Sequence, residues 1–326
     1  MTSSRHPKSA GGPAARRAVT YLITILYNSE ASLPTFLHGL LNQDISDWRL
    51  IVVDNASQDG APRLIERVAD PRIHLLRNAT NTGFARAANQ GLRFAAREGA
   101  DFTILFNNDT VLEPDFLRRF IDARNSLDAD VIAPRIMDSA DPTRAWYAGG
   151  HFEPSWVLHN VHEAYDAADP AEWRTVDYAS GCCLGLTRRA LETVGLFDES
   201  FFVYWEDADF CLRLTECGIK IHYVRDPFML HEGGGASGGE HTPAHHRLYY
   251  RSQMQFLRKH RGRRYATAAM GRLLLRERGR PGTRAADLRV MAAAMLEGLW
   301  APMKPPARLW SNDATARQAT TVPDAA

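Results

Sequence analysis

The sequence predicts an α/β fold in which helices cover both faces of a mostly parallel central sheet. Apolar, β-rich runs alternate with helical spacing through the first half of the chain, and three of the first four predicted strands end in Asn or Asp. Parallel strands bring their carboxyl ends to one edge of the sheet, where open α/β proteins bind ligands. The side chains of Asn28, Asp54, Asn108 and Asp109 therefore predict one site. The competing interpretation is that each of them simply favours a local turn.

Continuous apolar runs are typical of strands buried on both faces, whereas apolar residues spaced three and four apart predict helices. In the first half of the chain the predicted strands are 18–26, 48–53, 72–76 and 101–106. The predicted helices are 30–41, 61–69 and one that runs through 89–97. In the second half the predicted strands are 130–134, 176–186 and 220–224, and the predicted helices are 188–194, 206–218, one from 243, 266–275 and 285–300.

Composition narrows the function classes. The 39 basic and 38 acidic residues nearly cancel, so the global charge gives no case for nucleic-acid binding. No uncharged apolar stretch reaches the ~18 residues of a membrane span. The run 18–26 follows two arginines but lacks a small-residue cleavage site, so it is interpreted as a strand and not as a secretory signal. Four cysteines without a zinc-binding pattern predict buried free thiols in the reducing cytoplasm: Cys182, Cys183, Cys211 and Cys217.

The chain is expected to consist of four consecutive segments, with no long linker between the two halves of its main domain. Residues 1–17 lack periodicity and are expected to be disordered, residues 18–242 to form one compact domain, residues 243–303 a basic helical extension, and residues 304–326 a flexible tail. Two interpretations of the extension stay open. Its basic and apolar residues fit contact with the anionic inner face of the plasma membrane, or its long cationic side chains simply solvate a packed helix.

An acidic and aromatic cluster opens the predicted helix 206–218. Acids in a first turn stabilise a helix through its dipole, which needs no active site. A carboxylate beside Tyr204 and Trp205 is also desolvated, which raises its pKa and improves it as a base. The aromatic rings offer flat faces for a sugar. The cluster Tyr204, Trp205, Glu206 and Asp207 is therefore a candidate sugar and acceptor site.

His231 follows the last predicted strand in a glycine-rich loop, 231–239, that is long enough to fold over a ligand. This position predicts a metal ligand acting together with Asp109. Residues 233–238 satisfy the G-x-G-x-x-G pattern, but no strand-turn-helix unit surrounds them, so a dinucleotide site is not predicted there.

Taken in order, these motifs resemble the inverting family 2 glycosyltransferases of the GT-A fold, in particular their rhamnosyltransferase-like branch. The resemblance extends over roughly residues 18–260 and rests on the order and spacing of short segments. The matching segments are 53–60, 81–91, 107–110, 180–189, 195–199, 204–209 and His231. It implies a nucleotide-sugar half at 18–118 and an acceptor half at 119–242.

The resemblance also implies roles for single residues. Asp207 corresponds to the catalytic base, and Asp109, with His231, to the ligands of Mn²⁺ or Mg²⁺. Tyr204, Trp205 and Glu206 would contact the acceptor or the sugar. Asn107 replaces the first acid of the family's D-x-D element, so metal binding would rest on Asp109, His231 and the diphosphate. The implied donor-nucleotide contacts are Asn28, Asp54, Asn81, Gly83, Asn89 and Asn108.

The implied function is a metal-dependent, inverting hexosyl transfer in cell-envelope polysaccharide synthesis. The donor would be dTDP-rhamnose or a UDP-sugar, the acceptor a glycan or polyprenyl-linked glycan, and the sugar rhamnose in the branch that it resembles. The alternative is a non-catalytic nucleotide-sugar or glycan-binding protein of the same fold, for which Asn107 is the only sequence support. A nucleotidyltransferase is not expected, because residues 27–30 supply no glycine-rich phosphate loop after the first strand.

Overall fold

The computed structural model describes residues 19–153, 158–160, 172–233 and 242–310. The segment 1–17 that was expected to be disordered, the part of the expected flexible tail 304–326 beyond residue 310, and the glycine-rich loop from 234 lie outside the described residues. The strands are β1 Thr20–Leu26, β2 Trp48–Asp54, β3 Ile73–Arg77, β4 Phe102–Phe106, β5 Thr110–Val111, β6 Val131–Asp138, β7 Ala145–Tyr147, β8 Gly150–Phe152, β9 Leu158–Asn160, β10 Trp173–Val176, β11 Cys183–Thr187 and β12 Ile221–His231. The helices are α1 Leu33–Leu41, α2 Ala61–Val68, α3 Phe84–Arg97, α4 Phe116–Leu127, α5 Arg188–Val194, α6 Glu206–Glu216, α7 Pro243–Arg261, α8 Arg263–Arg278 and α9 Ala285–Trp300.

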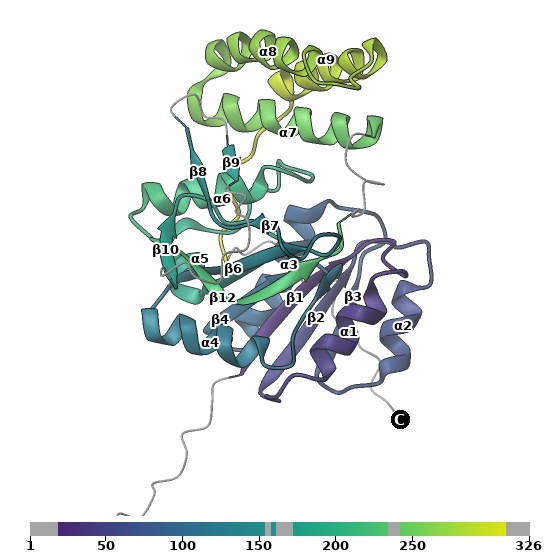
Figure 1. Ribbon diagram of the computed structural model, residues 1–326, viewed down its shortest axis with the longest axis vertical. Coiled ribbons are helices and arrows are strands. Elements are labelled where there is room, and N and C mark those ends of the chain that lie inside the picture. Colours follow the sequence, from purple (N-terminus) through teal and green to yellow (C-terminus); the bar gives the residue numbers. More distant parts are fainter. Residues whose placement is uncertain (1–18, 154–157, 161–171, 234–241, 311–326) are drawn as a thin grey trace, which may run out of the picture.

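The main sheet has the order β10-β12-β6-β11-β4-β1-β2-β3 (Figure 1). Strands β4, β1, β2 and β3 are parallel, as the alternation of strands and helices predicts. The expected, mostly parallel sheet is confirmed, with antiparallel pairs beyond β4: β11 pairs antiparallel with both β4 and β6, whereas β12 is parallel to β6. The described residues between β6 and β11 form strands β7 to β10 and contain no crossover helix that would set a parallel direction. The sheet is therefore mixed and continuous through both halves of the domain.

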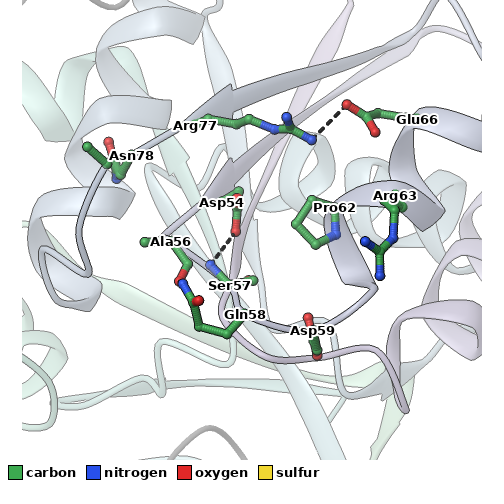
Figure 2. A pocket seen from close by; sticks show the side chains of 11 residues that line it. Asp54, Ala56, Ser57, Gln58, Asp59, Pro62, Arg63, Glu66, Arg77 and Asn78 are labelled. Carbon is green, nitrogen blue, oxygen red and sulfur yellow. Dashed lines mark hydrogen bonds and ion pairs between the residues drawn. The ribbon is translucent and has the colours of Figure 1, made fainter.

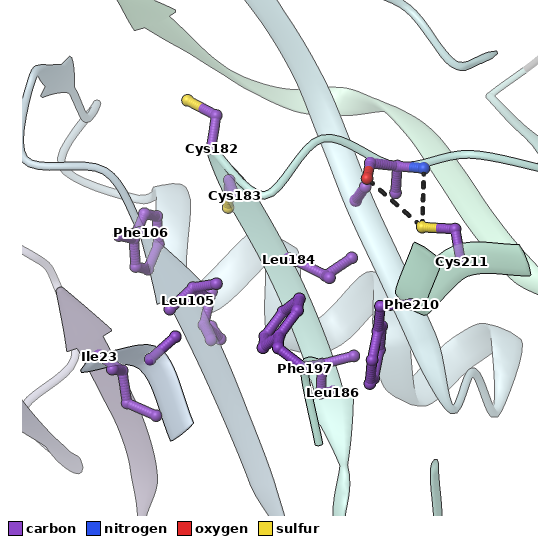
Figure 3. Close-up of a cluster of buried hydrophobic side chains, with 14 of the residues drawn as sticks. Ile23, Leu105, Phe106, Cys182, Cys183, Leu184, Leu186, Phe197, Phe210 and Cys211 are labelled. Atoms are coloured by element: carbon purple, nitrogen blue, oxygen red, sulfur yellow. Dashed lines mark hydrogen bonds between the residues drawn. The ribbon is translucent and has the colours of Figure 1, made fainter. Parts of the chain in front are cut away.

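Alternate side chains of β4 fill the core on opposite faces of this sheet. On one face, Phe106 contacts Phe36 of α1 and Phe116 of α4, with ring centroids 6.2 and 6.0 Å apart. On the other face, Leu105 lies toward Phe197 and Phe210 (Figure 3). Helices thus cover both faces, and the edge at the carboxyl end of β4 is left for a site.

The cysteines are free thiols, as expected, but they are not all buried. Cys182 and Cys183 lie at the start of β11, and Cys211 on α6 contacts the backbone of Ala179 (Figure 3). Cys217 is exposed and lies directly after the last residue of α6, Glu216.

The C-terminal extension is a stack of three helices, and α9 spans the expected residues 285–300. Figure 1 shows α7 between the domain and the pair α8 and α9. Ion pairs anchor α7 to the domain: Lys259 Nζ lies 2.6 Å from carboxylate oxygens of both Asp198 and Asp209, and His260 Nε2 lies 2.8 Å from Asp209. Every helix in the described part of the chain is too short or too polar to cross a membrane.

Asp209 is expected to make stability depend on pH. Burial alone would raise its pKa, but His260, Arg213 and Lys259 overcome burial and lower it to about 2, from an ordinary 3.8. Because the folded-state pKa is the lower one, Asp209 contributes stability above pH 3.8, on the order of 2 kcal/mol, which is lost as the pH falls toward 2. Thermal melts of Asp209→Asn should show a lower Tm at neutral pH and a flatter acid limb. Glu216→Gln neutralises an exposed acid on the same helix and should match wild type; equal losses in both variants would contradict the assignment.

Candidate active site

The ends of β1, β2 and β4 meet at one edge of the sheet, as the sequence predicts. Asn108 donates from Nδ2 to the carbonyl of Ile25 (2.8 Å), which ties the end of β4 to β1. The side chain of Asn28 accepts a hydrogen bond from the backbone N–H of Gln58 (2.8 Å) in the loop after β2. These amides join neighbouring loops and so shape the edge on which any ligand would lie.

A pocket of about 440 Å³ lies beyond β2 and β3 and has Asp54 in its wall (Figure 2). The carboxylate of Asp54 accepts a hydrogen bond from the N–H of Ser57 (3.0 Å), which fixes its orientation. Across the pocket, Arg77 pairs with Glu66 at 2.7 Å. A ligand in this pocket meets carboxylate, amide and guanidinium groups, which suits a polar heterocycle.

Asn55 is the buried centre of the loops around this pocket, and sequence reasoning missed it. Its Nδ2 donates to Asn81 Oδ1 (2.9 Å) and to the carbonyl of Gly83 (3.2 Å), and its Oδ1 accepts from the N–H of Thr82 (2.9 Å). Gly83 has φ +83°, and a Cβ there would lie 2.4 Å from the carbonyl oxygen of Phe202, so only glycine fits. The one feature of the sequence that could have indicated this role is the position of Asn55 directly after Asp54, at the end of β2.

Asn89 is not at the site, which corrects the prediction that it contacts the donor. Its side chain is fully buried, donates to the carbonyl of Phe197 (2.9 Å) and accepts from the N–H of the same residue (3.0 Å). It also donates to Glu199 (3.0 Å). Asn89 therefore ties α3 to the segment before α6, and its polar atoms are used in doing so.

Asp109 and His231 meet at this edge, with 3.3 Å between Asp109 Oδ1 and His231 Nε2. His231 is the last residue of β12, opposite Thr110 of β5, and does not lie in a loop as expected. Its ring packs against Trp146 at 4.5 Å between centroids. The strand continues past 224 because the irregularity between Val224 and Phe228 is accommodated as a bulge.

These two side chains fit a divalent cation. Asp109 Oδ1 and both ring nitrogens of His231 are buried and have no hydrogen-bond partner among the described residues. Such atoms are costly to leave unpaired, and a cation bound to carboxylate oxygen and imidazole nitrogen would satisfy them. The described residues contain no cluster of three or more potential metal ligands. A diphosphate and water would therefore complete the coordination of a cation here.

Asp207 is the second residue of α6, and its carboxylate is held on several sides. Oδ2 accepts from the hydroxyl of Tyr178 (2.8 Å) and the N–H of Gly181 (3.1 Å), and Oδ1 accepts from the N–H of Ala208 (2.7 Å). Tyr204 and Trp205, just before α6, have φ of +66° and +68°. Left-handed conformations are unfavourable for these residues and are maintained by surrounding contacts, often at functional sites.

Burial has the largest effect on the pKa values of Glu206 and Asp207, the first two residues of α6. It raises the pKa of Asp207, although the hydrogen bonds from Gly181, Tyr178 and Ala208 lower it in part. Burial, followed by the charge of Asp207, raises the pKa of Glu206 well above its ordinary value. Asp207 accepts three hydrogen bonds, whereas Glu206 Oε2 is buried with no hydrogen-bond partner among the described residues, so Asp207 holds a negative charge better. A charged carboxylate with a raised affinity for a proton has the properties of a general base.

The aromatic part of the predicted acceptor site is corrected in part. Trp205 is only 4% exposed and packs against Phe256 of α7, with 5.0 Å between ring centroids. It belongs to the core and offers no open face to a sugar. Glu206 is 5% exposed, so it too is largely enclosed. Tyr204 is half-buried beside His245 and remains a predicted sugar contact.

A two-residue segment lies between Asp207 and the loop that carries Asp109. Gly181 donates its N–H to Asp207, and the carbonyl of the next residue, Cys182, accepts the N–H of Asn107 (2.8 Å). Burial raises the pKa of the Cys182 thiol, and the charges of Asp109 and Asp207 both raise it further. The two carboxylates thus lie on either side of residues 181–182 at the same edge of the sheet.

Tyr178→Phe is expected to move the pH dependence of activity. Burial and the nearby charge of Asp207 raise the pKa of Tyr178 well above its ordinary value, so the phenol stays a donor. Removing that donor destabilises the Asp207 carboxylate and raises its pKa further, so the acid limb of kcat/KM should move to higher pH. A lower rate with an unmoved limb would contradict this role. Tyr147→Phe is the control, because Tyr147 is also buried but donates to the backbone carbonyl of Tyr178 (2.8 Å) and not to the carboxylate of Asp207.

Comparison with known proteins agrees with this geometry. The family model for Glycosyl transferase family 2 matches residues 21–195. The dTDP-rhamnosyl transferase RfbF of Shigella flexneri is 27% identical over 244 residues, which cover 73% of this chain and 78% of that protein. An N-acetylglucosaminyl-diphospho-decaprenol L-rhamnosyltransferase of Mycobacterium tuberculosis is 28% identical over 257 residues, covering 70% of this chain and 82% of that protein.

Solved structures share the fold at low identity. The mannosyltransferase PcManGT of Pyrobaculum calidifontis, in complex with GDP-Man and Mn²⁺, aligns with a TM-score of 0.56 and 16% identity over 91% of each chain. GalNAc-T7, solved with UDP, GalNAc and Mn²⁺, aligns with a TM-score of 0.58 and 12% identity over 90% of this chain and 60% of that one.

Proposed function

This chain belongs to glycosyl transferase family 2 and has the GT-A fold, and on that basis we propose that it transfers rhamnose from dTDP-rhamnose to a glycan. The acceptor is a hydroxyl of a glycan or lipid-linked glycan, and the product serves cell-envelope polysaccharide synthesis. The names of the Shigella and Mycobacterium relatives support the sugar and the lipid-linked acceptor. The reaction takes place in the cytoplasm, which fits the free thiols.

The observation that supports the proposal most is that Asp207 and Asp109 both lie near residues 181–182: Gly181 donates its N–H to Asp207, and the charges of both acids raise the pKa of Cys182. A donor whose base lies in the Asp54 pocket would extend its diphosphate along the edge formed by Asn28 and Asn108. Its diphosphate would then reach Asp109, and the anomeric carbon would face Asp207. Asn81 and Gly83 shape the same surface through Asn55.

Asp207 acts as the general base. It takes the proton of the acceptor hydroxyl while the acceptor oxygen forms a bond to the anomeric carbon. The bond from that carbon to the diphosphate oxygen breaks, and the nucleoside diphosphate leaves with the electron pair. Because attack comes from the face opposite the leaving group, the anomeric configuration inverts. Tyr178 and Gly181 hold Asp207 Oδ2, which orients the carboxylate for this proton transfer.

Asp109 and His231 would hold Mn²⁺ or Mg²⁺, and the bound cation would neutralise charge on the leaving diphosphate. The support for this role is that their buried ligand atoms, 3.3 Å apart at the nearest, make no hydrogen bond with the described residues. Trp146 packs on the imidazole ring and fixes its plane. Tyr204 contacts the sugar or the acceptor from the segment before α6.

A nucleotide-release assay over UDP-, GDP- and dTDP-sugars, with and without Mn²⁺ or Mg²⁺, tests the proposal. The expected result is turnover of dTDP-rhamnose with a lipid diphosphate-linked glycan acceptor and the metal present. Turnover of a UDP- or GDP-sugar in place of dTDP-rhamnose would refute the donor assignment. Binding of donors without consumption by any acceptor would refute transfer itself.

A further inference from the structure

The charge of this chain is strongly divided between its domain and its C-terminal helices. Residues 243–300 contain 13 Lys and Arg against 3 Asp and Glu, a net charge of +10. The whole chain is +1, so the remaining residues have a net charge of −9. The near-neutral total therefore conceals a strongly basic element at one end of the molecule.

Exposed apolar side chains lie on the same helices. Leu275 of α8 is 70% exposed, and Leu296 and Trp300 of α9 are 50% and 68% exposed. The guanidinium of Arg263, at the start of α8, lies 4.2 Å from the ring centroid of Trp300, so the two helices present these groups side by side. Large exposed apolar side chains within a basic surface are typical of helices that contact a membrane or another molecule.

This surface faces away from the catalytic domain. A Cβ at Gly298 of α9 would lie 2.2 Å from the carbonyl oxygen of Arg251, so that side of α9 packs tightly on α7. Leu296 and Trp300 are each two residues from Gly298 and therefore lie on roughly the opposite side of the helix. Figure 1 shows α8 and α9 beyond α7, with the sheet on its other side.

The charges on this outer surface are available to a ligand. Several of its arginines are exposed and form no ion pair with the described residues, namely Arg264, Arg272, Arg278 and Arg289. Only part of the basic charge is used internally, as in the pairs Arg247–Glu297 and Arg280–Glu277. A second copy docked through the same surface would bring like charges together and is disfavoured, and a nucleic acid would leave Leu275 and Leu296 in water.

We propose that the outer surface of α8 and α9 binds an anionic lipid bilayer, with Leu275, Leu296 and Trp300 inserted at the interface and the free arginines on lipid phosphates. The surface combines both contributions that hold a helix at an interface, apolar insertion and attraction to anionic headgroups. It also lies one helix layer from the site: on α7, Ser252 donates to the carbonyl of Val203 (2.8 Å), four residues before Asp207. A lipid-linked acceptor would reach Asp207 from this side, a consequence that rests on the proposed function.

Vesicle co-sedimentation without donor or acceptor tests the membrane surface independently of sugar transfer. Wild type should bind vesicles of phosphatidylglycerol and phosphatidylcholine at least about tenfold more strongly than phosphatidylcholine alone, and added salt should weaken binding. Leu296→Ser/Trp300→Ser and Arg264→Glu/Arg289→Glu should each lose most of this binding and keep the wild-type Tm. Arg67→Glu/Arg97→Glu makes the same charge change at exposed positions of α2 and α3 and should bind like wild type.

Three results would overturn the proposal. The first is that wild type remains in the supernatant with anionic vesicles, and the second is that the α2 and α3 control loses binding as completely as the α8 and α9 variants. The third is that duplex DNA or RNA displaces wild type from the vesicles and the same variants lose nucleic-acid binding, which would assign the surface to a nucleic acid. Turnover of a water-soluble acceptor measured in parallel separates these failures from a failure of the proposed function.

Discussion

Asp207→Asn is expected to lower kcat by about three orders of magnitude and to leave the protein folded. The amide cannot take the proton of the acceptor hydroxyl, but its oxygen can still accept from Tyr178 and Gly181, as Oδ2 does now. Nucleotide release from the donor in the presence of an acceptor measures the loss. Donor affinity, measured by calorimetry, should change little, because the effect is on proton transfer and not on binding.

Two control variants test whether the loss is specific to Asp207. Asp177→Asn makes the same change at an exposed position next to Tyr178 and should keep wild-type activity. Glu206→Gln should cost far less than Asp207→Asn, because Glu206 already has a pKa well above its ordinary value. If Glu206→Gln abolished transfer while Asp207→Asn retained it, the roles of the two acids would be reversed.

Asp109→Asn is expected to lower kcat/KM by about 100-fold or more, because it removes the one carboxylate that we assign to the cation. His231→Gln should have a smaller effect in the same direction, since it removes a neutral ligand. In both variants the Mn²⁺ concentration needed for half-maximal activity should rise. Chelation of the metal should abolish wild-type turnover, and added Mn²⁺ should restore it.

Asp101→Asn is the matched control for Asp109→Asn. It lies just before β4, at the opposite end of the strand from Asp109, with a side chain that is 84% exposed. It should respond to Mn²⁺ like wild type. If wild type and Asp109→Asn were both fully active in the presence of a chelator, the reaction would not depend on a metal, and this part of the mechanism would be wrong.

The sequence was sufficient where structure follows from local patterns. The strand ends at Asn28, Asp54 and Asn108 were predictable, because parallel strands bring their carboxyl ends to one edge. The meeting of Asp109 with His231 was also predicted, and the two lie 3.3 Å apart. The prediction that His231 lies in a loop was wrong. Asp226 and Pro227 interrupt the apolar pattern of β12, so the sequence does not reveal that the strand continues to His231.

Contacts between distant segments could not be predicted in this way. Tyr178 precedes Asp207 by 29 residues, and only the fold brings its hydroxyl to the carboxylate. Trp205 looked like a sugar platform, but α7 packs over it and buries it. Asn89 was expected to contact the donor nucleotide, but Phe197, 108 residues away, hydrogen-bonds to both of its polar atoms. Each of these outcomes depends on which element packs on which, and a linear pattern does not encode that.

A crystal structure of Asp207→Asn with Mn²⁺ and dTDP-rhamnose tests most directly whether one sugar nucleotide joins these distant residues. We expect the base in the Asp54 pocket, the metal on Asp109 and His231, and the anomeric carbon facing residue 207. A donor bound with its metal away from Asp109, or with its sugar directed away from residue 207, would contradict the account.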